Sequence, residues 1–166
     1  MVELTTIGLP ILNWFHLIAT VVWIGAMSTN FLILLPSLNE ALGPGPAIGK
    51  MMAAIMKRFR PIVYLSIITL TVTGSLMFYL NENYEGLLVF GNTWTIVIAL
   101  KHVFVASLVI LAVYSFEVLA PKVGKLAAKG PSPELAKLQK LQLNLAKSGF
   151  ALGIIILLFT GISSSL

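Results

Sequence analysis

Residues 93–119 decide the fold class, and they read TWTIVIALKHVFVASLVILAVYSFEVL. A helix needs about 20 predominantly apolar residues to cross a hydrocarbon core of about 30 Å, and this stretch supplies them. Three further apolar stretches of comparable length occur near residues 11–35, 61–80 and 142–164. The sequence therefore predicts four transmembrane helices.

The composition of the whole chain supports the same conclusion. The 166 residues are 58% hydrophobic and only 10% charged, whereas soluble proteins carry about 25% charged residues. We therefore predict an integral membrane protein with an all-α fold, in which one transmembrane domain (residues 1–166) forms a four-helix up-and-down bundle. The chain has no Cys, which excludes disulfides, zinc-thiolate sites, iron-sulfur clusters and thiolate nucleophiles.

Prolines suggest where the predicted helices begin and end. Pro36 and Pro121 are expected to end the first and third helices, and Pro61 is expected to begin the second. This interpretation makes residues 36–60 and 120–141 loops, the first of which contains a short interfacial helix.

The basic residues predict the orientation in the membrane. Ten of the eleven Lys and Arg residues lie in or beside the two predicted loops: Lys50, Lys57, Arg58, Arg60, Lys122, Lys125, Lys129, Lys137, Lys140 and Lys147. By the positive-inside rule both loops are cytoplasmic, so both termini of this multi-pass protein are expected outside the cell membrane. The acidic residues are expected in the loops.

The two halves of the chain resemble each other. The Thr-Gly pair at residues 73–74 superposes on the pair at 160–161, and His16 falls over His102 at nearly the same offset. We interpret the chain as two tandem helical hairpins of parallel topology, related by a pseudo-twofold axis along the membrane normal.

Both histidines of the chain lie inside predicted membrane helices, where ionisable residues are rare and are functional candidates. His16 and His102 lie on helices that run in the same direction, each roughly 9 to 14 Å below the outer ends. Gly74 and Gly161 of the other two helices are expected at about that level. Diagonal helices of a bundle are separated by roughly 11 to 14 Å, which suits two imidazoles that bind one heme iron.

This arrangement predicts a heme b (iron protoporphyrin IX) with His16 and His102 as iron ligands. Gly74 and Gly161 are expected to let the porphyrin approach their helices closely. The propionates are expected to point to the outer face, toward Asn13, Trp14, Trp94 and Lys101. Structural alternatives remain open for each group: glycines as helix-packing notches, Trp14 and Trp94 as interfacial belt residues, and Lys101 as a side chain that snorkels to the outer interface.

With His16, Gly25, the Arg60-Pro61 pair, the Thr73-Gly74 pair and the Lys101-His102 pair in place, most of the chain resembles the superfamily of copper-resistance protein D domains and HemJ-type protoporphyrinogen oxidases. HemJ-like proteins are heme-binding helical bundles, and the resemblance implies functional roles for the His of the first helix and the Lys of the third. Those fall on His16 and Lys101. The resemblance to copper-resistance D proteins implies copper uptake.

The resulting functional hypothesis is a membrane b-type cytochrome with one bis-His heme near the outer face and a role in electron transfer. With both axial positions filled, oxygen activation is disfavoured. A quinone or an outer-side electron carrier is the expected partner, nucleic acid is not, and a homo-oligomer or larger membrane complex remains open. The alternatives are a copper-ion transport protein of the copper-resistance D type and a HemJ-like protoporphyrinogen oxidase, so it stays undecided whether the protein is an enzyme.

Overall fold

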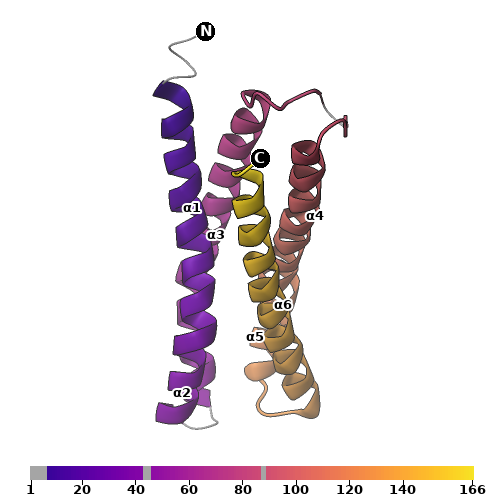
Figure 1. Ribbon diagram of the computed structural model, residues 1–166. Helices are drawn as coiled ribbons and strands as arrows, with labels where there is room; N and C mark the ends of the chain where they lie inside the picture. Colours follow the sequence, from indigo (N-terminus) through magenta and orange to yellow (C-terminus); the bar gives the residue numbers. More distant parts are fainter. Residues whose placement is uncertain (1–6, 43–45, 87–88) are drawn as a thin grey trace.

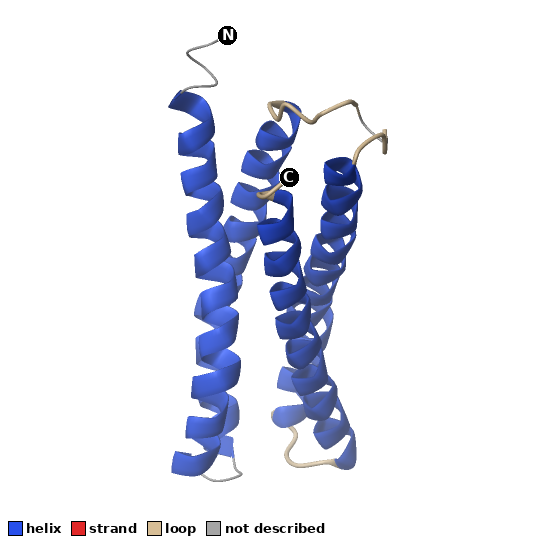
Figure 2. Ribbon diagram, viewed as in Figure 1, coloured by secondary structure: helices blue, strands red, loops and turns tan. Residues whose placement is uncertain are grey.

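A computed structural model of the protein describes residues 7–42, 46–86 and 89–166 (Figure 1). Helix accounts for nearly all of these residues, and the part described contains no strand (Figure 2). The chain forms four long rods whose segments are α1 (Leu9–Thr29), η2 (Asn30–Leu34) and α2 (Leu35–Leu42); α3 (Pro46–Tyr79); α4 (Thr93–Val113), η3 (Tyr114–Leu119) and α5 (Ala120–Ala127); and α6 (Pro133–Ser163). All four rods are long and apolar enough to span a membrane, which confirms the predicted all-α membrane bundle.

The rods pack as two helical hairpins. The closest packing joins α1 to α3 and α4 to α6, and the contacts between the two pairs are fewer. Both hairpins start at the end of the bundle that carries Leu9, Tyr79, Thr93 and Ser163, which we call the terminal end. The two hairpins run side by side in the same sense, as the sequence repeat predicts (Figure 1).

At the end opposite the terminal end the helices continue through residues that the sequence assigned to loops, so the helix ends predicted at Pro36, Pro61 and Pro121 are wrong. Pro36 lies inside a rod that reaches Leu42, and Pro121 lies inside one that reaches Ala127. Pro61 does not begin a helix, because α3 already starts at Pro46. Hydropathy marks the part of a helix that lies in hydrocarbon, whereas backbone hydrogen bonding can continue well beyond it.

A π-helical segment precedes each of the two prolines that were expected to end a helix. In η2 the N–H of Leu35 donates to the carbonyl of Asn30, and in η3 the N–H of Ala120 donates to that of Ser115. Both segments stop two residues before the proline. A proline ring removes one N–H donor and crowds the preceding turn, and a wider π turn relieves both problems without breaking the rod. The same solution at matching positions strengthens the case for a repeat.

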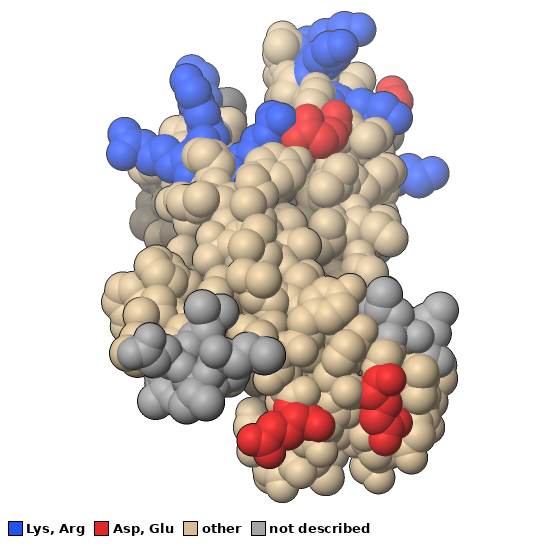
Figure 3. Space-filling view, turned by 90° about the horizontal axis from the view of Figure 1, so that it is seen from above, with Lys and Arg blue, Asp and Glu red and all other residues tan. Residues whose placement is uncertain are grey.

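Cations gather at one end of the bundle. Lys and Arg lie together on one side of Figure 3, at the end opposite the terminal end, and we call this the basic end. Acidic side chains lie both among these cations and at the other edge of the view (Figure 3). At 1.5 Å per residue the rods are roughly 46 to 52 Å long, against about 30 Å of hydrocarbon. The rods therefore have several turns to spare, and most of the cations lie on those turns.

The core sits where the two hairpins meet. Trp23, Val63 and Leu108 form its buried centre, one residue each from α1, α3 and α4. From α6 come Gly149 and Gly153, which are both buried. A methyl group added to Gly149 would lie 3.5 Å from the Met27 sulfur, and one added to Gly153 would lie 3.5 Å from the Met27 methyl. These two glycines hold α1 against α6 and so join the hairpins.

Candidate functional site

His16 on α1 is half-buried and bonds to the neighbouring helix α3. Its Nδ1 atom lies 2.8 Å from the hydroxyl oxygen of buried Thr73. That hydroxyl already donates its only hydrogen to the carbonyl of Thr69, at 2.7 Å. The proton between His16 and Thr73 must therefore sit on Nδ1 of the histidine. In the neutral imidazole Nε2 then carries the free lone pair, which is the form that binds a metal.

His102 on α4 reaches the same form through its own helix. Its Nδ1 lies 2.7 Å from the carbonyl oxygen of Ile98, which can only accept, so Nδ1 is the protonated nitrogen. A metal-ligating histidine commonly donates its second N–H to a carbonyl, a carboxylate or a water. The His102 side chain is more exposed than that of His16. The edge of its ring meets Phe78 of α3, with 6.2 Å between ring centroids.

The two histidines share one level of the bundle. His16 lies seven residues into α1 and His102 nine residues into α4, which places them roughly 10 to 14 Å from the helix starts at the terminal end. The His16 ring packs on Gly74 of α3, and the His102 ring contacts Phe78, one turn further along the same helix. Both histidines thus lie against neighbouring turns of α3.

The two glycines proposed for this level differ in their surroundings. A Cβ on Gly74 would lie 3.3 Å from Cε1 of His16, so the bare backbone of Gly74 is what lets the imidazole sit against α3. Nothing lies within 4 Å of the position a Cβ would take on Gly161. Gly74 thus acts on the first histidine directly, while Gly161 offers an open stretch of α6.

Lys101 is less exposed than its neighbour His102. It is only partly exposed, and it precedes His102 on a helix whose buried stripe includes Trp94, Ile98 and Leu108. The spacing from Ile98 to Lys101 and on to Leu108 is that of one helix face. Lys101 therefore lies on the inward side of α4.

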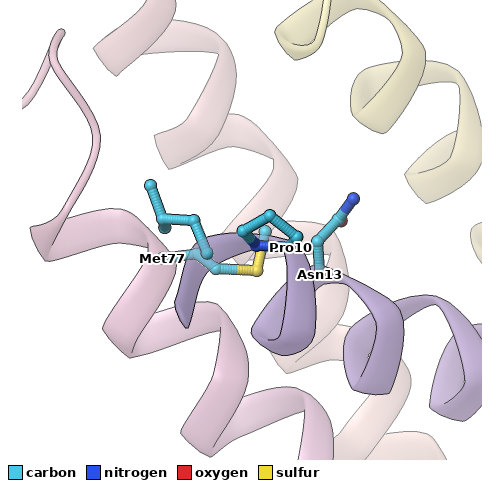
Figure 4. A pocket seen from close by; sticks show the side chains of 4 residues that line it. Pro10, Asn13 and Met77 are labelled. Carbon is cyan, nitrogen blue, oxygen red and sulfur yellow. The ribbon is translucent and has the colours of Figure 1, made fainter. Parts of the chain in front are cut away.

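Asn13 and Trp14 lie on different faces of α1, and Asn13 shares the face of His16 one turn nearer the terminal end. Asn13 lines a hollow of about 530 Å³ at the terminal end with Leu9, Pro10 and Met77. Figure 4 shows Met77 reaching from α3 toward Pro10, with Asn13 directed away from both. Trp14 is 57% exposed, and its ring packs on Phe15. Two residues are 200° apart on a helix, so Trp14 projects opposite His16.

Trp94 is buried, whereas the sequence suggested a residue of the interfacial belt. It is only 7% exposed and stacks on Phe78, with 5.7 Å between ring centroids and an interplanar angle of 11°. Phe78 belongs to the first hairpin and Trp94 to the second. The stack therefore joins the hairpins one or two turns from His102, toward the terminal end.

A second polar cluster lies toward the basic end. Arg60 of α3 donates to the Glu117 carboxylate of η3 at 2.7 Å, and the Tyr64 hydroxyl donates to the other carboxylate oxygen at 2.5 Å. The expectation that acidic residues occupy only the loops is wrong, because Glu117 lies within a membrane-spanning rod. Arg60 is consequently an ion-pair partner across the hairpins as well as a cation near the membrane surface.

Sequence reasoning missed this pair because residues 57 positions apart show no local pattern. It also missed the Gly149 and Gly153 notch, for which a signal existed. Their spacing is the small-xxx-small pattern that marks close helix packing in membranes. Matching of the two repeats directed attention to Gly74 and Gly161 instead.

Comparison with known proteins gave a match for the part of the chain that contains most of these residues. The family model for Copper resistance protein D matches residues 53–163, well over half of the chain. The chain belongs to the copper resistance protein D family. The match includes Gly74, Lys101, His102 and Gly161, and it begins after His16. Neither the curated proteins nor the solved structures gave a match.

Proposed function

We propose that this copper resistance D family protein is a membrane b-type cytochrome in which His16 and His102 bind one heme b. The observation that carries the proposal is that both Nδ1 atoms donate a hydrogen bond. His16 donates to the Thr73 hydroxyl, and His102 donates to the carbonyl of Ile98. Both Nε2 atoms are left as acceptors at one level of the bundle. Two histidines fixed in the metal-binding tautomer are what a six-coordinate heme requires from its protein.

The donor set favours a heme over a bare metal ion. Within the described residues no group of three or more His, Asp or Glu side chains could hold a metal. Protein metal sites commonly need three or four protein ligands. A porphyrin supplies four nitrogen ligands itself, so two histidines complete the coordination. Bound in this way the heme would supply one-electron redox chemistry and little oxygen activation.

The residues around the histidines then have distinct roles. Thr73 and the Ile98 carbonyl orient the imidazoles, and Gly74 leaves room for the His16 ring. We assign Lys101 to a propionate, since it brings a positive charge to the level of the histidines. Asn13 lies one turn from His16 on the same face of α1 and is assigned to a propionate as well, whereas Trp14 projects from the opposite face and makes no such contact.

The proposed orientation places the basic end in the cytoplasm and both termini outside the cell membrane. Its support is the positive-inside rule applied to the Lys and Arg residues, which gather at the basic end (Figure 3). In this orientation the heme lies in the outer half of the membrane. Its electron partners would be a quinone or a carrier on the outer side.

The test is an absorption spectrum of the purified protein, oxidised and reduced, after expression with ample heme. The proposal expects about one heme per chain, with resolved α and β bands on reduction. His16→Ala and His102→Ala should each lose this spectrum, whereas Trp14→Ala, on the opposite face of α1, should keep it. A wild-type protein that stays colourless despite heme supply overturns the proposal.

Copper handling is the second candidate, and the family match favours it. Copper could use an imidazole of the His16 and His102 pair with Met thioethers such as that of Met77. Metal analysis of the same purified sample separates the two candidates. Stoichiometric copper without heme, lost in the histidine variants, supports copper transport.

A HemJ-like protoporphyrinogen oxidase is the third candidate, and the position of Lys101 on the helix face of buried Ile98 and Leu108 favours it. An assay of protoporphyrinogen oxidation by the purified protein tests it. Activity that depends on Lys101 supports this candidate, and a heme protein without it leaves electron transfer as the function.

A further inference from the structure

A hollow on α3 near the basic end has no part in the proposed heme site. It has a volume of about 720 Å³ and is lined by Ala54, Lys57, Arg58, Pro61 and Ile62. All five residues belong to one face of the helix, since their spacing is that of successive turns. We propose that this hollow binds the phosphodiester headgroup of an anionic phospholipid.

The hollow faces away from the bundle. Its lining residues are exposed, whereas Val63 and Ser66 of the same helix are buried against the core. In a membrane protein, an exposed helix face that points away from the core lies next to lipid. The hollow is therefore open to the surroundings of the bundle, where a lipid can reach it.

The depth of the two cations matches the lipid phosphates. Arg58 lies 21 residues from the terminal end of α3 at Tyr79, or roughly 32 Å along the helix. The hydrocarbon core is about 30 Å thick, so a headgroup lies just beyond it. Pro61 and Ile62 lie one turn closer to the membrane centre, where acyl chains begin. Along the helix, the cations thus lie at the depth of a phospholipid headgroup and the apolar residues at the depth of its acyl chains.

The two cations are available for a phosphate. The nearby Arg60 is already paired with Glu117. Among the residues described, Lys57 and Arg58 have no carboxylate within ion-pair distance. An arginine fork and a lysine ammonium are both established phosphate-binding groups.

Pro61 adds a hydrogen-bond acceptor to the same wall. Inside a helix a proline has no N–H to give to the carbonyl four residues earlier, which here is that of Lys57. Lys57 and Pro61 both line the hollow. A headgroup that carries hydroxyls, such as phosphatidylglycerol, can donate to this carbonyl while its phosphate meets the cations.

The test measures how lipids raise the melting temperature of the detergent-purified full-length protein. Dioleoylphosphatidylglycerol is titrated against dioleoylphosphatidylcholine and inorganic phosphate, and each titration yields an apparent affinity. Each cation near an anionic headgroup contributes about fivefold, so K57Q/R58Q is expected to bind phosphatidylglycerol about 25-fold more weakly. The matched control K122Q/K125Q removes two charges from α5 at the same end and is expected to change the affinity less than about twofold.

Three results would overturn the proposal. Equal losses in the two double variants would mean a diffuse charge effect, and unchanged binding in K57Q/R58Q would mean a different site. Equal protection by inorganic phosphate or by phosphatidylcholine would remove the lipid headgroup as the specific ligand. If the double variant does not purify, K57Q and R58Q alone should each show about a fivefold loss. None of these measurements depends on heme.

Discussion

The two hairpins have the same plan, yet they hold their histidines differently. In the α1 and α3 hairpin, His16 donates across the helix interface to Thr73 and packs on Gly74. In the α4 and α6 hairpin, His102 donates to Ile98 of its own helix. Thr160, the counterpart of Thr73, donates to the carbonyl of Ile156 and receives no histidine.

This difference shows what the repeat preserves. Helix lengths, the π segments before the prolines and the level of the histidines are shared by both halves. The partner of each imidazole is not shared, although both partners fix the same tautomer. The first hairpin should therefore depend on its threonine and glycine more than the second hairpin depends on their counterparts.

The largest expected effect comes from the threonines. Thr73→Val leaves the Nδ1–H of His16 without its acceptor, and loss of such a partner commonly weakens metal binding by about 10- to 100-fold. Thr160→Val removes a hydroxyl that holds no histidine, so heme affinity should change less than about twofold. Heme titration of the two apoproteins, followed by absorbance, measures both. Equal losses would contradict the asymmetry of the hairpins.

A smaller effect is expected from the glycines. Gly74→Ala forces the His16 ring to shift, and a displaced rotamer corresponds to about a 2- to 10-fold loss of heme affinity. Gly161→Ala meets nothing within 4 Å, so the heme-free protein should keep its melting temperature. If the porphyrin lies along α6 as proposed, Gly161→Ala still lowers heme affinity. Unchanged heme binding in Gly161→Ala would remove Gly161 from the site.

The smallest effect concerns the pair between the hairpins. Arg60 and Glu117 are 47% and 41% exposed, and ion pairs of that exposure contribute about 0.5 to 1 kcal/mol. A double-mutant cycle with Arg60→Gln and Glu117→Gln, followed by denaturant unfolding, should return a coupling energy of that size. Lys147, the repeat counterpart of Arg60, should show no coupling to Glu117. A coupling near zero for Arg60 would mean that the pair does not hold the hairpins together.

The sequence predicted the membrane bundle because hydrophobicity is summed over whole helices. Low charge and four apolar stretches require lipid-facing helices whatever the details of packing. The helix ends were not predictable in the same way. Pro36 and Pro121 are strong helix-breaking signals in isolation, and the π turns that absorb them have no sequence signature of their own.

The sequence predicted the members of the candidate site but not their contacts. His16 and His102 stand out because ionisable residues are rare in membrane helices. Which atom each imidazole faces depends on helix rotation and tilt, which residue spacing does not specify. The Arg60 and Glu117 pair depends on the same two quantities, and so it emerged only with the structure.

The central claim is that His16 and His102 bind the iron of one heme, and electron paramagnetic resonance of the oxidised protein tests it most directly. The account predicts the spectrum of low-spin ferric heme with two imidazole ligands, converted to a high-spin signal or lost in His16→Ala and in His102→Ala. A Cu(II) spectrum, with the splitting of the copper nucleus and no heme signal, would contradict it.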